Sequence, residues 1–245
     1  MESAFSLDKV FYEQINEKMT SLGYKYVRKY KMFMKAINNI LLKYFFIEKY
    51  PAINKGNKSF MLTGNVRSVY ADSFERDELK NESMRNNIFV DIDRGFKNGY
   101  PKHYDCSIEQ AKETLNRAFA DAQEGILGEI EKINSFDEYI HYCHMYNYRQ
   151  ILCAPFYKDS LALIVANDHN NMEERLNKTC MAYEESLGKE YVRAQYSLFV
   201  HSFIELVAGE RDKVYNNPIL YKEALEEAER RKEANTQTLM TLKLI

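Results

Sequence analysis

The residues best placed for chemistry are Asp91 and Asp93, in the sequence Ile-Phe-Val-Asp-Ile-Asp at residues 88–93. A β-strand turns successive side chains to opposite faces, so both carboxylates would share one face of a strand here. Two carboxylates at a strand end can hold Mg²⁺ or Mn²⁺ beside a phosphate-containing substrate, which makes Asp91 and Asp93 the candidate catalytic and metal-binding residues. The pattern favours a plainer interpretation, in which both are solvated residues on the exposed face of an antiparallel strand.

A second group of residues with ligand chemistry consists of His141, Cys143, His144 and Cys153. A structural zinc site needs four such ligands close together, and on a helix His141 and His144 share a face whereas Cys143 points elsewhere. The sequence contains no C-x-x-C pair and no H-E-x-x-H helix. We therefore interpret the histidines as structural and predict no cofactor.

A run of basic and aromatic residues begins at residue 24, and its candidate contact residues are Lys25, Arg28, Lys29, Lys31 and Lys35. Lysines interleaved with tyrosines can neutralise phosphates and stack the bases of single-stranded nucleic acid, so the five residues are candidates for contact with nucleic acid or a protein partner. The interpretation that we favour is a strand whose solvated lysines protect an exposed sheet edge. The nucleic-acid hypothesis requires the basic residues of 24–58 to lie on one continuous face.

The residue pattern predicts an α+β fold with an N-terminal helix and an antiparallel sheet of four or five strands. Apolar residues recur at helical spacing over 6–22, with Ser6 as N-cap and Gly23 as the glycine that ends the helix. Up to residue 70, three or four segments rich in β-branched and aromatic residues alternate with turn residues such as Asn38-Asn39. A further strand is expected at 87–93.

Beyond Asp105 the sequence predicts five or six helices. The first has Ser107 as its N-cap, at the capping-box spacing to Gln110, and runs to about Glu124 or on to Lys132. The next begins at Ser135. The others are expected at 150–166, 171–187, 189–208 and 217–242. The chain therefore has a sheet region, 1–105, and a helical region, 106–245, which we expect to pack together as one continuous body.

Composition limits the class of protein. The 245 residues are 45% hydrophobic and 29% charged, enough to close a core without disulfides, and the four cysteines are widely spaced and expected to be reduced. No apolar run reaches the ~18 residues of a membrane span, and the first residues do not resemble a secretory signal, so a cytoplasmic location is expected. Residues 1–70 carry a net charge of +7 and the remainder −9, which indicates either a basic contact surface or two complementary parts of one fold.

Three stretches together resemble an uncharacterised bacterial domain family. They are Leu22-Gly23-Tyr24-Lys25 followed by YKMFMKAINNILLKYFFIEKY, the strand KSFMLTGNV, and ILGEIEKINSFDEYIHYC, which together cover about half of the chain. The resemblance implies an N-terminal helix that leads into an antiparallel sheet, followed by a capped helix. Families of this kind often include immunity proteins that bind a toxin and block it, but no catalytic residue transfers from the resemblance.

These observations favour a non-enzymatic protein-binding module, of the immunity or interaction type, with another protein as its partner. Two alternatives stay open: a metal-dependent enzyme that uses Asp91 and Asp93 on a phosphate-containing substrate, and a nucleic-acid-binding module that uses the basic region 24–58. The apolar end of the chain, residues 239–245, either folds back onto the protein or contacts a partner.

Overall fold

The computed structural model describes residues 5–52, 54–71, 73–77, 79–80, 103–140, 160–166 and 217–245. Asp91 and Asp93, the strand expected at 87–93 and the group from His141 to Cys153 lie outside these residues. No helix within the described ranges is long and apolar enough to span a bilayer.

The first helix, α1, runs over Leu7–Ser21 and ends as the sequence predicts. Gly23 has φ +84°, a conformation that glycine adopts without steric cost. The Tyr24 N–H donates to the Met19 carbonyl and the Gly23 N–H to the Thr20 carbonyl, the pair of hydrogen bonds that defines a Schellman motif. The motif satisfies the last carbonyls of α1 and turns the chain directly into the first strand.

Five antiparallel strands follow in the order β1-β2-β3-β4-β5, which confirms the predicted α+β fold. They are β1 (Lys25–Val27), β2 (Met32–Ile37), β3 (Leu41–Tyr50), β4 (Lys58–Ser68) and β5 (Tyr104–Cys106). Asn38 and Asn39, both with positive φ, form the predicted turn between β2 and β3. The sequence did not predict β5, which pairs with only the first three residues of β4.

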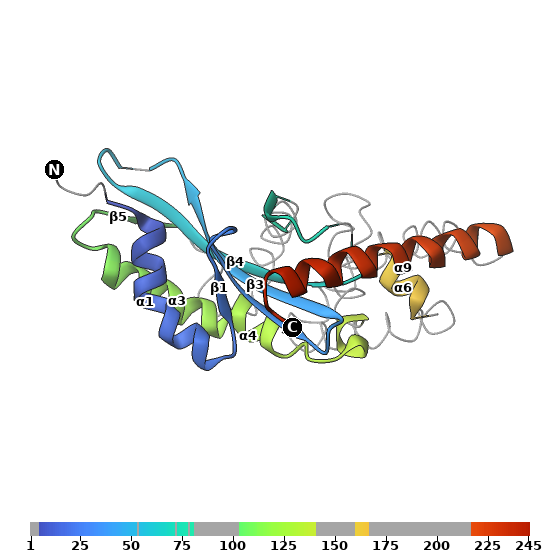
Figure 1. Ribbon diagram of the computed structural model, residues 1–245. Helices are drawn as coiled ribbons and strands as arrows, with labels where there is room; N and C mark the ends of the chain where they lie inside the picture. Colours follow the sequence, from blue (N-terminus) through green and yellow to red (C-terminus); the bar gives the residue numbers. More distant parts are fainter. Residues whose placement is uncertain are drawn as a thin grey trace, which may run out of the picture. The chain divides into compact units, whose positions relative to one another are not determined.

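One face of the sheet is covered by α1 and α3 (Ala111–Glu124), which lie along it in Figure 1. Phe11 of α1 packs edge-on against Phe33 of β2 at 5.5 Å between ring centroids, and Phe119 of α3 packs against Phe45 of β3 at 6.2 Å. All four rings are fully buried. This aromatic layer fixes which side chains of β2 and β3 face the helices.

The helical half has fewer helices than predicted within the described residues. They are α3, α4 (Ile126–Glu131), α6 (Ser160–Val165) and α9 (Pro218–Thr241), and residues 136–140 are also helical. The expected helices at 171–187 and 189–208 lie outside the described ranges. The helix predicted to begin at Ser135 has a capping box there, because the Ser135 hydroxyl accepts from the Glu138 N–H at 3.2 Å and the Glu138 carboxylate accepts from the Ser135 N–H at 2.9 Å.

The N-cap predicted for the first of these helices, Ser107, was wrong by three residues, because the observed N-cap is Gln110. Ser107 does accept a hydrogen bond from the Gln110 N–H, at 3.4 Å, but residues 108–110 form a turn and the helix begins at Ala111. The helix also stops at Gly125, whose ψ of −116° is not helical, and α4 begins afresh after it. A local hydrogen bond of the capping type therefore did not start a helix here.

The chain divides into two compact units. The first contains Met1–Val66, Glu75–Lys132 and Leu239–Ile245, and the second contains Arg67–Phe74 and Ile133–Thr238. In the second unit, the buried Asn235 side chain of α9 donates to the carbonyls of Val69 and Ala71 at 2.9 Å and accepts from the Phe74 N–H at 3.2 Å. These bonds attach the segment after β4 to α9. The packing of the whole chain as one continuous body stays a prediction.

The end of the chain folds back within the first unit. Leu239 is fully buried, and Lys25 Nζ donates to the Leu242 carbonyl at 2.9 Å and to the Lys243 carbonyl at 3.3 Å. A cation is favourable at these carbonyls because they carry the partial negative charge at the end of a helix. Of the two alternatives for residues 239–245, the structure therefore shows the fold-back.

Candidate functional site

The five basic candidates do not share one surface. Lys25 pairs with Met34 across the ladder, so it lies on the same face as Met34, whereas Lys35 is the next residue on β2 and faces the other way. Arg28 and Lys29 are exposed in the turn after β1, where Lys29 Nζ donates to the Tyr30 hydroxyl at 3.2 Å and lies 4.0 Å from Glu75. Lys31 and Lys35 each join a separate cluster around one carboxylate.

The first cluster, which we call the Asp8 clamp, consists of Asp8, Lys31 and Lys49. Lys31 Nζ and Lys49 Nζ both lie 2.9 Å from Asp8 Oδ2. The three residues come from the first turn of α1, the turn before β2, and the end of β3. The lysine side chains are 53% and 49% exposed and that of Asp8 is 16% exposed, so the cations reach the surface while the carboxylate is held beneath them.

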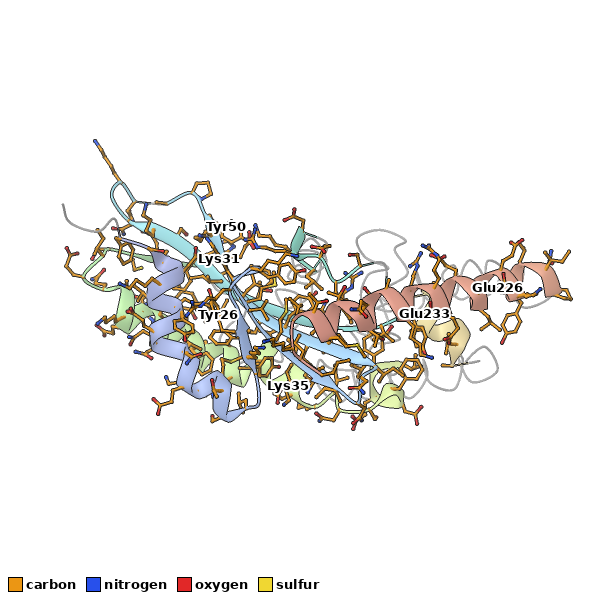
Figure 2. The ribbon with its side chains drawn as sticks, viewed as in Figure 1. Tyr26, Lys31, Lys35, Tyr50, Glu226 and Glu233 are labelled. Carbon is orange, nitrogen blue, oxygen red and sulfur yellow. The ribbon has the colours of Figure 1, made fainter. Side chains whose placement is uncertain are left out.

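The charges of the Asp8 clamp perturb its neighbours. Burial alone would raise the pKa of Asp8, but the hydrogen bonds donated by Lys49 and Lys31 outweigh burial and the pKa of Asp8 is lowered. Tyr26, labelled in Figure 2 with Lys31, has a raised pKa because it is partly desolvated and lies near the Asp8 carboxylate. The ring of Tyr26 packs against Tyr12 at 4.7 Å, so a pair of partly exposed aromatic rings lies beside the clamp.

Lys31 is in an unusual backbone conformation for its position. Its φ is +56°, in the left-handed region, where a residue with a Cβ costs about 1–2 kcal/mol relative to the right-handed region. Its N–H donates to the Val27 carbonyl at 2.8 Å, which closes the turn between β1 and β2. Glycine or asparagine would adopt this backbone conformation more easily. The conformation of the turn therefore does not explain why residue 31 is a lysine, and its side chain is the feature to account for.

The second cluster, which we call the Glu131 cluster, consists of Tyr24, Lys35, Lys43 and Glu131. Glu131 is the last residue of α4, and its carboxylate accepts from the Tyr24 hydroxyl at 2.7 Å, from Lys35 Nζ at 3.0 Å and from Lys43 Nζ at 3.3 Å. Lys43 Nζ also donates to the Glu131 carbonyl at 3.3 Å. Lys43 is fully buried, and the side chains of Lys35 and Glu131 are 21% and 25% exposed.

The sheet register places two lysines opposite each other, and the Glu131 carboxylate compensates their positive charges. Lys35 and Lys43 are direct partners in the β2–β3 ladder, and like charges directly opposite one another destabilise a strand pair. Both side chains point to the face covered by helices, because each is two residues from a phenylalanine of the aromatic layer. Glu131, brought there by α4, lies against both ammonium groups.

The pKa shifts show how strongly the Glu131 cluster is coupled. Burial raises the pKa of Glu131, but the hydrogen bonds from Tyr24 and Lys35 and the charges of Lys43 and Lys35 reverse this, and its pKa falls below the ordinary value of 4.5. Burial, with the adjacent Glu131 carboxylate, raises the pKa of Tyr24 well above 10.0. The neutral phenol of Tyr24 and the ionised carboxylate of Glu131 are therefore the stable forms near neutral pH.

Another buried carboxylate, Glu48 on β3, lies on the opposite face of the sheet from Lys43. Glu48 is 4% exposed, and its Oε1 lies 2.8 Å from Lys80 Nζ. Its Oε2 has no hydrogen-bond partner among the described residues, but this atom is itself buried and so presents no surface to a ligand. We therefore do not include Glu48 in the candidate site.

The described residues offer no metal centre of protein ligands. Within residues 5–52, 54–71, 73–77, 79–80, 103–140, 160–166 and 217–245, no three His, Cys, Asp or Glu residues come together as a possible metal site. The candidate metal ligands Asp91 and Asp93 are not among these residues, so their role stays a prediction. The Asp8 clamp is an accessible charged group that includes Lys31 of the predicted basic run.

Sequence reasoning found one lysine of each cluster and missed the rest. Lys31 and Lys35 were candidates, whereas Asp8, Lys49, Lys43 and Glu131 were not. The turn at Asn38-Asn39 could have shown that Lys35 faces Lys43, because a short hairpin loop fixes which residues are opposite. Nothing in the sequence indicates that Glu131, 96 residues after Lys35, is their partner.

No family model, curated protein or solved structure matches the chain. The resemblance to an uncharacterised bacterial family therefore rests on the three stretches quoted above.

Proposed function

We propose that the protein is a non-enzymatic binding module, of the immunity or interaction type, whose partner is another protein. The observation that carries this proposal is the pair of adjacent aliphatic side chains at the start of α9. Ile219 is 69% exposed and Leu220 is 42% exposed. Burying such a side chain completely is worth about 1.5–3 kcal/mol, so the pair is a favourable anchor for an apolar pocket on a partner.

The start of α9 is well defined. The Asn217 side-chain oxygen accepts from the N–H groups of Ile219 and Leu220, at 3.0 Å and 3.3 Å, which is the bonding of an N-cap residue. Pro218 follows the cap, where its fixed φ suits the first turn of a helix. The two aliphatic side chains are thus displayed on an ordered turn, which lowers the entropy lost on binding.

Several charged side chains that follow on α9 are paired with one another. Lys222 lies 3.5 Å from Glu226, and Glu227 lies 2.7 Å from Arg230 and 2.6 Å from Arg231. Because these pairs join opposite charges along the helix, the surface around the aliphatic pair has little net charge. A partner protein with an apolar pocket and a rim of mixed charge fits this surface, and its binding should depend only weakly on salt.

The nucleic-acid alternative has less support. It requires the predicted basic residues to form one continuous face, whereas Lys25 and Lys35 lie on opposite faces of the sheet. Binding through phosphate contacts would also weaken steeply as the salt concentration rises. Salt dependence therefore separates the two functions.

Photocrosslinking tests the proposal directly. A photoreactive residue is placed at position 219 and, as the matched control, at position 240, where Met240 is 53% exposed on the same helix. In extracts of the native host we expect one protein adduct from position 219, equal in yield at low and high salt and reduced by the Leu220→Ser substitution. Equal adducts from both positions, or a nucleic-acid adduct that disappears at high salt, would contradict the proposal.

A further inference from the structure

We propose that Lys31 and Lys49 form a binding site for the phosphate group of a small phosphate ester or of free phosphate, and that Asp8 occupies this site when no ligand is bound. The site is separate from the surface on α9 and does not depend on the proposed protein partner.

The geometry of the clamp suits a tetrahedral anion. Both ammonium nitrogens lie 2.9 Å from one oxygen, Asp8 Oδ2, so they converge on a single point. Lysine binds phosphate as a point charge with rotatable N–H donors, and two lysines can take one phosphate oxygen or two neighbouring oxygens of the same group. The carboxylate of Asp8 marks the place of that oxygen.

The charge of the clamp favours phosphate over a single carboxylate. Lys31 and Lys49 together carry two positive charges, and Asp8 supplies one negative charge. A phosphate monoester carries about −1.5 to −2 at pH 7 and so matches the two lysines more closely than Asp8 does. The lysine side chains, 53% and 49% exposed, can reach such a ligand without leaving a buried position.

The strained turn supports a role for Lys31 that folding alone does not require. Its φ of +56° would be adopted more easily by glycine or asparagine, and an exposed ion pair returns little stability for that strain. A binding function accounts for a lysine at this position. Lys49 takes part from the end of β3.

A small ligand fits better than a nucleic-acid strand. Lys35 is held in the Glu131 cluster and Lys25 at the carbonyls of Leu242 and Lys243, so the predicted basic run does not continue from the clamp along the sheet. The aromatic pair of Tyr12 and Tyr26 lies beside the clamp and offers a ring surface to a phosphate ester with an aromatic group.

Titration calorimetry with inorganic phosphate and with phenyl phosphate, at constant ionic strength, tests this inference. We expect both ligands to bind. The Asp8→Asn substitution should increase the affinity for inorganic phosphate about fivefold, which corresponds to the effect of one exposed ion-pair contact. In the Asp8→Asn background, Lys31→Gln and Lys49→Gln should each lower the affinity for inorganic phosphate about fivefold. Tighter binding of phenyl phosphate would identify an aromatic ester as the source of the phosphate, and equal binding would identify the free anion.

The matched control is Lys9→Gln, because Lys9 lies next to Asp8 on α1, is 73% exposed, and pairs with Glu13 at 3.8 Å. Lys9→Gln removes one positive charge close to the clamp but leaves Asp8, Lys31 and Lys49 unchanged. Its affinity for phosphate should therefore stay within about twofold of that of the protein without this substitution. An equal loss in Lys9→Gln and Lys49→Gln would show only diffuse attraction and overturn the proposal. So would an Asp8→Asn variant that is folded by circular dichroism and binds no phosphate.

Discussion

The Asp8 clamp and the Glu131 cluster each place two lysines on one carboxylate within the same compact unit, but they differ in their contact with water. Lys43 is fully buried and Lys35 is 21% exposed, whereas the two lysines of the clamp are about half exposed. Two of the four lysines, Lys43 and Lys49, lie on the same strand, β3. The same set of charges can therefore serve different purposes, and burial decides which.

The physical reason is the cost of desolvation. Removing one partner of a buried ion pair leaves the other in a medium that solvates charge poorly, which typically costs 3–5 kcal/mol. An exposed pair is screened by water and contributes about 0.2–1 kcal/mol. We infer that the Glu131 cluster holds β2, β3 and α4 together, while the Asp8 clamp contributes little to stability and is free to exchange its carboxylate for a ligand.

The largest expected effect comes from Glu131→Gln. The substitution should lower the free energy of unfolding by about 3 kcal/mol, because the fully buried Lys43 and its ladder partner Lys35 both lose the carboxylate. Urea unfolding followed by circular dichroism measures the change. The double variant Lys43→Met with Glu131→Gln should recover much of the loss, and no recovery would mean that charge burial is not the cause.

Lowering the pH should decrease the free energy of unfolding of the wild type more than that of the Glu131→Gln variant. The pKa of Glu131 is lower in the folded protein than its ordinary value of 4.5, so the carboxylate stabilises the fold fully above that value, and the stabilisation is lost as the pH falls through the folded pKa. The free energy of unfolding, measured between about pH 5 and pH 3, should therefore decrease more steeply for the wild type. Parallel curves for the two proteins would contradict this assignment.

Tyr24→Phe should cost about 1.5 kcal/mol of unfolding free energy, because it removes a hydrogen bond from a buried phenol to an ionised carboxylate. The matched control is Tyr30→Phe. Tyr30 is equally buried, but its hydroxyl donates at 3.3 Å to Glu75, whose side chain is 62% exposed. The control should change stability by less than about 0.5 kcal/mol. Equal losses of unfolding free energy in the two variants would contradict the claim that a hydrogen bond to the partly buried Glu131 stabilises the protein more than one to the exposed Glu75.

A small effect on stability is expected for Asp8→Asn. Asp8 has a lowered pKa, yet its lysine partners are about half exposed, so removing its charge should change the free energy of unfolding by less than about 1 kcal/mol. The same urea titration provides the measurement. A loss as large as that of Glu131→Gln would make the clamp a structural element and weaken the case for a ligand.

Much of the fold could be predicted because local residues determine it. Gly23 ends α1, Asn38-Asn39 marks the turn between β2 and β3, and Ser135 begins a helix with Glu138 as its capping partner. In each case the responsible groups lie within a few residues of one another. The three-residue strand β5 was missed because so short a segment has too little periodicity to recognise, and its pairing with β4 is set by tertiary contacts.

The candidate site was less predictable because its partners are distant in the sequence. Lys31 is 23 residues from Asp8, and Lys35 is 96 residues from Glu131. Charge counting identified a basic N-terminal segment correctly but could not show that Lys25, Lys31 and Lys35 point in different directions. The tertiary fold alone distributes these lysines between a helix end, a surface clamp and a buried cluster.

The most direct test compares Lys43→Gln with Lys49→Gln in one set of urea titrations. The two variants make the same chemical change on the same strand, at a fully buried and a half-exposed position. We expect Lys43→Gln to lower the free energy of unfolding by about 3 kcal/mol and Lys49→Gln by less than about 0.5 kcal/mol. Equal losses at the two positions would contradict the division between a structural cluster and an exchangeable clamp.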